Sequence, residues 1–166
     1  MKNKISKKIV SFLDIEKISY ELKKQGKVIV TTNGAFDILH YGHVMSLEKA
    51  KSYGDILIIG LNSDSSIKQY KSLDRPIISQ EYHAKMLVSL EIVDYVVIFD
   101  ETNPIKFLSY VKPNFHVKSK LGFKGIEKDI VEKNNGKIIL IDDIPGISTS
   151  EIINKIINLE KNNLIK

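Results

Sequence analysis

Five short, largely apolar segments alternate along the chain with segments in which apolar residues recur at helical spacing. The apolar segments lie at 27–32, 55–62, 94–100, 114–119 and 137–142. The helical patterns lie at 10–25, 43–53, 80–92, 104–111, 126–135 and 149–160. Strands that are apolar on both faces and alternate with helices are typical of a parallel sheet covered on both sides. The sequence therefore predicts a Rossmann-like, doubly wound α/β domain with a five-stranded parallel sheet.

The length and composition limit the class of protein. A chain of 166 residues fits one domain, which we expect to span residues 1–166. The absence of cysteine excludes disulfides, cysteine-bound zinc and thiol catalysis. No apolar run approaches the ~20 residues of a membrane helix, and Asp14, Glu16 and Lys17 interrupt the N-terminal segment before it reaches signal-peptide length. We expect a cytoplasmic protein with no membrane partner.

The basic residues do not indicate a nucleic-acid-binding protein. The formal net charge is +5, but Arg75 is the only arginine among the 25 basic residues, and the lysines are spread along the chain. Proteins that read nucleic acids favour arginine, whose guanidinium makes paired hydrogen bonds. We therefore expect no nucleic-acid partner, and a basic cleft for a small phosphorylated ligand fits the charge.

The segment TTNGAFDILHYGHV, residues 31–44, is the predicted ligand site. It joins the end of the first strand to the start of a helix, where free amides and the helix dipole favour phosphate. Gly34 and Gly42 allow tight turns and a close approach of the backbone to a ligand. His40 and His43 can donate hydrogen bonds to phosphate oxygens and stabilise charge on phosphorus. The alternative is that His40 caps the helix and His43 begins it, with no ligand.

The same segment resembles the HxGH signature of the nucleotidyltransferase superfamily. Members of this superfamily join a nucleoside triphosphate to a phosphate or carboxylate acceptor and release pyrophosphate. Within it, TNGAFDILHYGH followed by GLNSD is similar to D-glycero-β-D-manno-heptose 1-phosphate adenylyltransferases. The resemblance continues through RPI at 75–77, LEIVDYVVIFDETNP at 90–104 and GISTSEII at 146–153. Glycerol-3-phosphate cytidylyltransferases share much of this pattern.

The resemblance implies roles for individual residues. His40 and His43 would stabilise the pentacoordinate phosphorus, and Lys71 would be the third catalytic residue, a point charge for phosphate oxygens. Lys68 could share that task, although both lysines could also be solvated helix residues. The nucleotide-binding residues expected are Thr32, Asn33, Gly34, Ala35, Phe36, Asp37, Gly42, Lys68, Arg75, Lys118, Ser148, Thr149 and Ser150. Among these, Asp37 is expected to order the site.

The triad Ser148-Thr149-Ser150 matches the family's STT element at the last helix. Hydroxyls and free amides at a helix start suit a triphosphate. The structural alternative is a capping box, with Ser148 three residues before Glu151. The two interpretations are compatible, because one hydroxyl can cap the helix while its neighbours contact phosphate.

The sequence departs from the family at two places. His83 stands where the family has an arginine, and residues 118–122 read KSKLG, where the family has a KGGDY-like string. We predict that Arg75 supplies the missing guanidinium and that His83 is a weak phosphate contact, charged below a pKa of ~6.5. His116, in an apolar strand, is predicted to be a core or edge histidine.

The resemblance implies transfer of an adenylyl group from ATP to a heptose 1-phosphate, which would give ADP-heptose for lipopolysaccharide assembly. The resemblance implies a homodimer and, as a partner in the same pathway, a separate sugar kinase. We expect Mg²⁺ held mainly by the nucleotide phosphates, since no cluster of residues has zinc-ligand spacing. The alternatives are CTP-dependent transfer to glycerol 3-phosphate or another polyol phosphate, and a catalytically weakened nucleotide-binding module.

Overall fold

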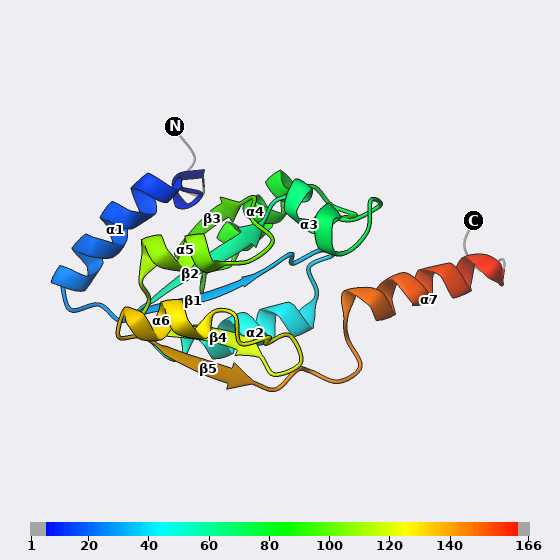
Figure 1. Ribbon diagram of the computed structural model, residues 1–166. Coiled ribbons are helices and arrows are strands. Elements are labelled where there is room, and N and C mark those ends of the chain that lie inside the picture. The colour runs from blue at the N-terminus through cyan, green and yellow to red at the C-terminus, as the bar shows by residue number, and fades with distance from the viewer. Residues whose placement is uncertain (1–5, 163–166) are drawn as a thin grey trace.

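A computed structural model describes residues 6–162, and it contains one α/β domain built on a parallel sheet (Figure 1). The expected ends of the domain, residues 1–5 and 163–166, lie outside the described residues. The strands are β1 (Ile29–Gly34), β2 (Ile56–Asn62), β3 (Tyr95–Phe99), β4 (Phe115–Ser119) and β5 (Lys137–Ile141). The helices are η1 (Ser6–Lys8), α1 (Phe12–Lys24), α2 (Tyr41–Lys51), α3 (Asp64–Tyr70), α4 (Gln80–Ser89), α5 (Ile105–Val111), α6 (Lys128–Lys133) and α7 (Thr149–Lys161).

The five strands are parallel and lie in the order β3-β2-β1-β4-β5, which confirms the predicted fold class. The chain first adds strands on one side of β1 and then on the other. The order therefore reverses between β1 and β4. In open α/β sheets the crevice at such a switch point, outside the carboxyl ends of the strands, is the usual ligand site.

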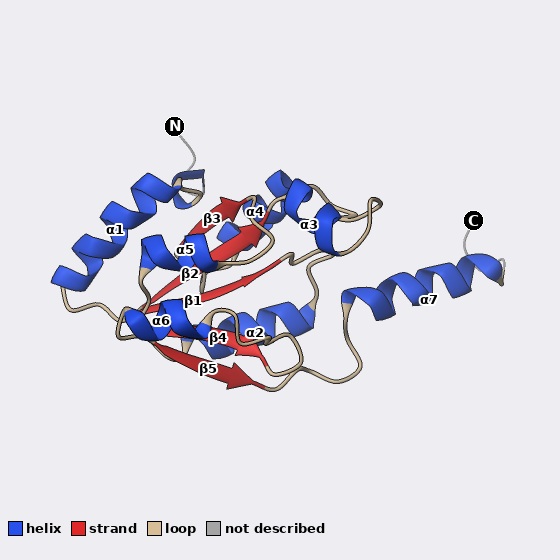
Figure 2. Ribbon diagram, viewed as in Figure 1, coloured by secondary structure: helices blue, strands red, loops and turns tan. Residues whose placement is uncertain are grey.

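Helices cover both faces of the sheet (Figure 2). One core packs strand residues such as Ile59 against Leu47 of α2 and Leu87 of α4. The other packs Ile58 and its neighbours against α1, α5 and α6, with Phe107 of α5 fully buried. Adjacent residues such as Ile58 and Ile59 thus face opposite cores, which explains the unbroken apolar run at 56–59 in β2.

The structure corrects several predicted boundaries. β1 begins two residues after the predicted start and extends through Gly34, which pairs with Leu61 of β2. The predicted helix 80–92 ends at Ser89, because Leu90 has an extended backbone and leaves the helix. The sequence analysis gave no bounds for a helix between residues 62 and 80, although it allowed Lys68 and Lys71 to be helix residues, and α3 lies there. Its only buried apolar residue is Ile67, too few for an apolar periodicity.

α7 differs from the other helices in its packing. It extends away from the sheet and its helices (Figure 1), and none of its residues is buried. Among residues 6–162, no helix has both the length and the apolar character that crossing a membrane requires.

Candidate active site

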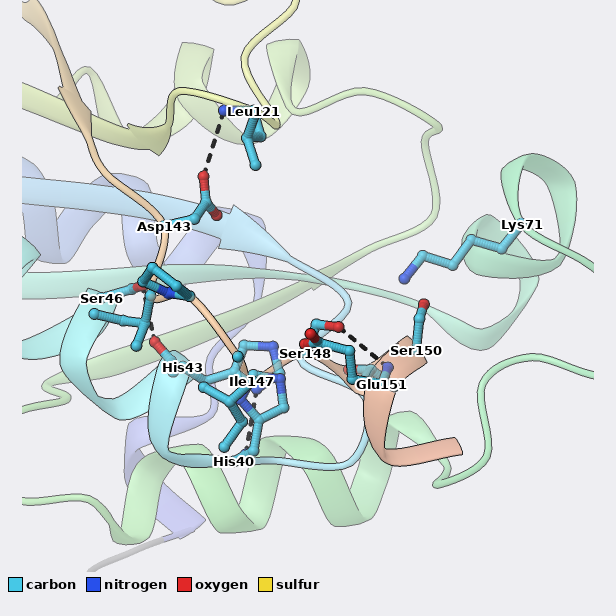
Figure 3. A pocket seen from close by; sticks show the side chains of 15 residues that line it. His40, His43, Ser46, Lys71, Leu121, Asp143, Ile147, Ser148, Ser150 and Glu151 are labelled. Atoms are coloured by element: carbon cyan, nitrogen blue, oxygen red, sulfur yellow. Dashed lines mark hydrogen bonds between the residues drawn. The ribbon is translucent and has the colours of Figure 1, made fainter. Parts of the chain in front are cut away.

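Two cavities adjoin at the carboxyl ends of β1 and β4, at the switch point of the sheet. The larger has a volume of about 670 Å³ and the smaller about 240 Å³. They share the lining residues His43, Ser46, Lys71, Asp143 and Thr149. The larger cavity, whose lining side chains are drawn in Figure 3, is lined in addition by His40, Gly42, Leu121, residues 144–148, Ser150 and Glu151. The smaller cavity is lined in addition by residues 32–37, Val117, Lys118, Ser119, Gly122 and Ile141.

His40 and His43 lie together where α2 begins, as the sequence predicted. His40 is the N-cap residue of α2, and the two rings stack with their centroids 3.8 Å apart. The backbone N–H of His40 donates to Nδ1 of His43 at 3.4 Å. In a neutral ring with Nδ1 as acceptor, the proton is on Nε2. The Nε2–H of His43 can therefore donate a hydrogen bond to a ligand in the cavities.

The electrostatics of the two rings favour the neutral form. Burial, with His40 and Lys71 nearby, lowers the pKa of His43 to about 4. Burial also lowers the pKa of His40, and the carboxylate of Glu151 opposes that shift. At neutral pH, His43 is thus an uncharged hydrogen-bond donor beside the cationic Lys71.

Gly42 is required by a close approach rather than by an unusual backbone angle. A Cβ at this position would lie 3.1 Å from the His40 ring and 3.2 Å from Cγ2 of Ile147. A side chain would therefore press the ring of His40 and the segment before α7 away from α2. The glycine between the histidines lets these three parts of the site pack together.

Asp37 ties the loop before α2 to the segment that follows Lys71. Its flanking residues Phe36 and Ile38 both have a φ of 50°, in the left-handed region. The buried carboxylate accepts hydrogen bonds from the backbone N–H groups of Ile77 and Ile78 and from Nε of Arg75, the last at 2.7 Å. Burial raises the pKa of Asp37, but these hydrogen bonds and the Arg75 charge outweigh it and hold the pKa below its ordinary value. The residue is thus an ionised anchor, consistent with its predicted ordering role.

Arg75 and His83 are not where the sequence analysis expected them. The guanidinium of Arg75 pairs with Asp37 and lines neither cavity. His83 is 1% exposed, with Nε2 3.5 Å from Oδ1 of Asp37. Burial lowers the pKa of His83, and Asp37 and Asp64 oppose this shift. The predicted role of His83 was a pH-dependent contact with phosphate. A buried histidine that is neutral at physiological pH does not fit that role, because burial, and not a ligand, determines its protonation.

Of the two candidate lysines, only Lys71 lines the cavities. It is the C-cap residue of α3, and burial, with Arg75 nearby, lowers its pKa. Figure 3 shows its side chain directed toward the first residues of α7. Lys68 is exposed on α3 and lines neither cavity, which fits the solvated alternative for that residue.

The start of α7 forms one wall of the larger cavity. Oγ of Ser148 accepts from the N–H of Glu151 at 3.2 Å, which agrees with the capping interpretation. Oγ1 of Thr149 donates to the carbonyl of Asp37 at 2.7 Å and so attaches α7 to the loop before α2. The Ser150 side chain lines the cavity (Figure 3). The free amides and the dipole of this helix start point to an anion site.

Lys118 lies at the smaller cavity. Its Nζ donates to Oδ1 of Asn33 at 3.1 Å, across the β1–β4 pair. Burial lowers the pKa of Lys118, and Glu127 opposes the shift. His116, two residues earlier on β4, is fully buried with Nδ1 2.9 Å from Oγ1 of Thr31, so it is the core histidine that was predicted.

Several lining residues were missed by the sequence analysis. Ser46 follows Gly42 by one helical turn, and its hydroxyl donates to the Gly42 carbonyl at 2.9 Å. Asp143 lies just beyond β5 and accepts from Oγ of Ser119 at 2.6 Å. Its position after a strand was the available signal, since the carboxyl ends of parallel strands share one edge of the sheet.

Comparisons with known proteins agree with this geometry. A sequence model of the cytidylyltransferase-like family matches residues 31–155. The bifunctional protein HldE of a Nitratiruptor species is 50% identical over 148 residues, which cover 89% of this chain and 31% of that protein. HldE of Aliarcobacter butzleri is 47% identical over 93% of this chain and 32% of its own length. The chain thus spans about a third of the length of these curated relatives.

Two solved structures are similar to the fold. A lipopolysaccharide core biosynthesis protein from Thermoplasma volcanium aligns with a TM-score of 0.62 and 27% identity, over 72% of this chain and 99% of its own. A pantoate-beta-alanine ligase from Francisella tularensis aligns with a TM-score of 0.59 and 18% identity, over 92% of this chain and 78% of its own. The second similarity concerns the fold alone.

Proposed function

The chain belongs to the cytidylyltransferase-like family, and from this premise we propose that it is a nucleotidyltransferase that transfers an adenylyl group from ATP to a sugar 1-phosphate. The observation that carries the proposal is the stacked His40–His43 pair, which lines the larger cavity together with Lys71 and the start of α7, with His43 also lining the smaller one. The acceptor proposed is D-glycero-β-D-manno-heptose 1-phosphate, on the sequence resemblance of residues 31–44. The similarity to a lipopolysaccharide core biosynthesis protein supports an acceptor of this class.

The proposed reaction needs positioning and charge stabilisation more than proton transfer. An oxygen of the acceptor phosphate, already ionised at neutral pH, attacks the α-phosphorus of ATP. The new P–O bond forms as the bond to the β-phosphate oxygen breaks, and pyrophosphate leaves with the electron pair. Nε2–H of His43 and the ring of His40 donate to oxygens on the α-phosphorus, where negative charge concentrates. Lys71 and the amides at the start of α7 bind the departing phosphates.

Mg²⁺ is the proposed cofactor, held mainly by the nucleotide phosphates. Among residues 6–162, no group of three or more His, Cys, Asp or Glu side chains could hold a metal ion. The larger cavity does offer the carboxylates of Asp143 and Glu151, hard oxygen ligands of the kind that Mg²⁺ prefers. Bound there, the ion would neutralise phosphate charge.

The proposed partners are a second copy of the chain and a sugar kinase. The uncovered apolar side of α7 supports the homodimer. The acceptor is a sugar phosphate, so a phosphoryl transfer to the sugar must precede this reaction. The bifunctional relatives are about three times as long as this chain, and the separate kinase stays a prediction from the sequence.

Pyrophosphate release tests the proposal directly. The protein is incubated with Mg²⁺ and each pairing of ATP, CTP, GTP or UTP with heptose 1-phosphate, glycerol 3-phosphate or glucose 1-phosphate. We expect the fastest release with ATP and heptose 1-phosphate. Fastest release with CTP and glycerol 3-phosphate would establish the cytidylyltransferase alternative. No release with any pair, together with measurable ATP binding, would establish the weakened binding module.

A further inference from the structure

A buried carboxylate lies behind the smaller cavity, and the chemistry proposed above does not use it. Glu127 is the N-cap residue of α6, and its side chain is 4% exposed. Oε1 lies 3.8 Å from Nζ of Lys118, and within residues 6–162 the buried Oε2 has no hydrogen-bond partner. Burying an incompletely paired carboxylate destabilises a fold. A buried carboxylate of this kind in a native protein therefore needs an explanation other than its contribution to stability.

The neighbour of this carboxylate is the lysine of the site. The Lys118 side chain is 13% exposed and lines the smaller cavity. Its Nζ donates to Oδ1 of Asn33 at 3.1 Å and, more weakly, to the Asn33 carbonyl at 3.4 Å. At 3.8 Å, Glu127 attracts the ammonium without taking a hydrogen bond from it. An ammonium has three N–H donors, so Lys118 keeps donor capacity for a ligand.

We propose that Glu127 is a positioning residue, which holds the Lys118 ammonium at the wall of the smaller cavity so that it binds a phosphate group of a reactant. The identity of the reactant rests on the proposed function. The coupling between the Glu127 and Lys118 side chains does not, because it is a property of the free protein.

The other charged groups around Lys118 cannot replace Glu127. Glu127 from α6 and His116 from β4 act on it electrostatically, and the ionisable residues that line the smaller cavity with it are His43, Lys71, Asp37 and Asp143. Burial, with Lys118 nearby, lowers the pKa of His116 to about 3, so this ring is neutral. Asp37 is held by Arg75 and two backbone amides, and Asp143 by Ser119. Glu127 is thus the carboxylate available to Lys118.

The sign of the coupling follows from these charges. Burial lowers the pKa of Lys118 and the Glu127 carboxylate raises it. Removing the carboxylate therefore makes Lys118 lose its proton at a lower pH. An opposite charge at this range shifts a pKa by roughly one to three pH units.

NMR titration of Lys118 tests the coupling in the ligand-free full chain. The signal from its Nζ and Cε is assigned by its loss in Lys118→Met. In Glu127→Gln we expect the Lys118 midpoint to fall by about one pH unit or more. The matched control is Asp142→Asn, which removes the partner of the exposed Lys120 at 2.7 Å and leaves the Lys118 midpoint unchanged. An unchanged midpoint in Glu127→Gln overturns the inference.

Binding of inorganic phosphate, a minimal mimic of the phosphate group of a reactant, measured calorimetrically, tests the role without turnover. We expect Glu127→Gln to weaken binding, increasingly so as the pH rises, and to have no further effect in a Lys118→Met background. Additive effects of the two changes would overturn the inference. If Glu127→Gln does not fold, Glu127→Asp keeps the charge at a greater distance and should move the Lys118 midpoint down by a smaller amount. A failure of every triphosphate and acceptor pair to release pyrophosphate would contradict the proposed function alone.

Discussion

The two histidines of the site have different hydrogen-bonding roles, although the HxGH string presents them as a pair. His43 is fixed as an Nε2–H donor because its Nδ1 accepts from the backbone of His40. His40, in contrast, has a buried Nδ1 without a partner among the described residues. The sequence analysis placed both histidines at the start of a helix and predicted that they contact phosphate. It could not predict which nitrogen carries the proton or that the pKa of His43 falls to about 4, because both depend on burial and on neighbours distant in the sequence.

Replacing either histidine should affect the chemical step more than binding. We expect His40→Ala or His43→Ala to lower kcat by roughly 10²–10³, the loss typical of one donor to a developing charge. The dissociation constant for ATP should change much less. Tyr41→Ala is the control, since Tyr41 lies between the histidines in sequence but is 61% exposed. Parallel losses in affinity and kcat/KM would mean that the rings only hold the nucleotide.

His116 should make stability depend on pH. Its pKa is about 3 in the folded protein and ~6.5 when unfolded, so below pH 6.5 only the unfolded state takes up a proton there. The free energy of unfolding is therefore highest above pH 6.5 and decreases as the pH falls toward 3. His116 accounts for about 3 kcal/mol of the decrease from pH 7 to pH 4. In urea denaturation, His116→Gln should show a smaller decrease by that amount; an unchanged pH dependence would contradict this assignment.

Arg75 should act through Asp37. Arg75→Lys keeps the charge but loses the hydrogen bond from Nε to Oδ2 of Asp37, so we expect destabilisation of about 1–3 kcal/mol. The affinity for ATP should fall as well, since Asp37 also holds residues 77 and 78 after Lys71. In an Asp37→Asn background, Arg75→Lys should cost little more. Loss of ATP affinity with unchanged stability would instead favour the original prediction of a direct phosphate contact.

At the scale of elements, the strands were predicted from the sequence more completely than the helices and loops that connect them. Runs of adjacent apolar residues mark β2, β3 and β5 in the sequence; β2 and β3 bury most of these residues, whereas β5 buries only Ile141. The segment between β2 and α4 has one buried apolar residue, Ile67, so α3 left no periodic signal. The N-cap of α3 is Ser63, whose hydroxyl accepts a hydrogen bond from the N–H of Ser66. A polar cap of this kind cannot be found by a search for apolar periodicity.

The attachment of α7 to the loop before α2 gives an element-scale prediction. Thr149→Val keeps the shape of the side chain but removes the hydrogen bond to the Asp37 carbonyl. Because this bond sets the start of α7 against the His40–His43 pair, we expect ATP affinity to fall by about fivefold, which corresponds to ~1 kcal/mol. Thr102→Val, on an exposed threonine outside both cavities, should leave affinity unchanged. Equal affinities in the two variants would show that the α7 start is held by other contacts.

For the whole molecule, the strand order is what the sequence could not supply. Alternating strands and helices predict a parallel sheet but are compatible with several orders. The order found, β3-β2-β1-β4-β5, brings residues 32–37 and Lys118 to one edge although Asn33 and Lys118 are 85 positions apart. The cavities, and the contact between Lys118 and Asn33, follow from that order and were not predictable from either segment alone.

The uncovered side of α7 gives the prediction for the assembled protein. Ile152, Ile153, Ile156 and Ile157 recur at helical spacing, none of them is buried, and Ile156 and Ile157 are 50% and 43% exposed. A helix of 13 residues is about 20 Å long, so two copies packed along this side, together with adjoining surface, could reach the ~800 Å² per partner of a stable interface. We expect a homodimer in sedimentation velocity and a monomer for the double variant Ile156→Asp and Ile157→Asp. Asn158→Asp adds charge on the opposite side of α7 and should stay dimeric. A monomeric wild-type protein, or a double variant that sediments as a dimer, would show that α7 does not form the interface.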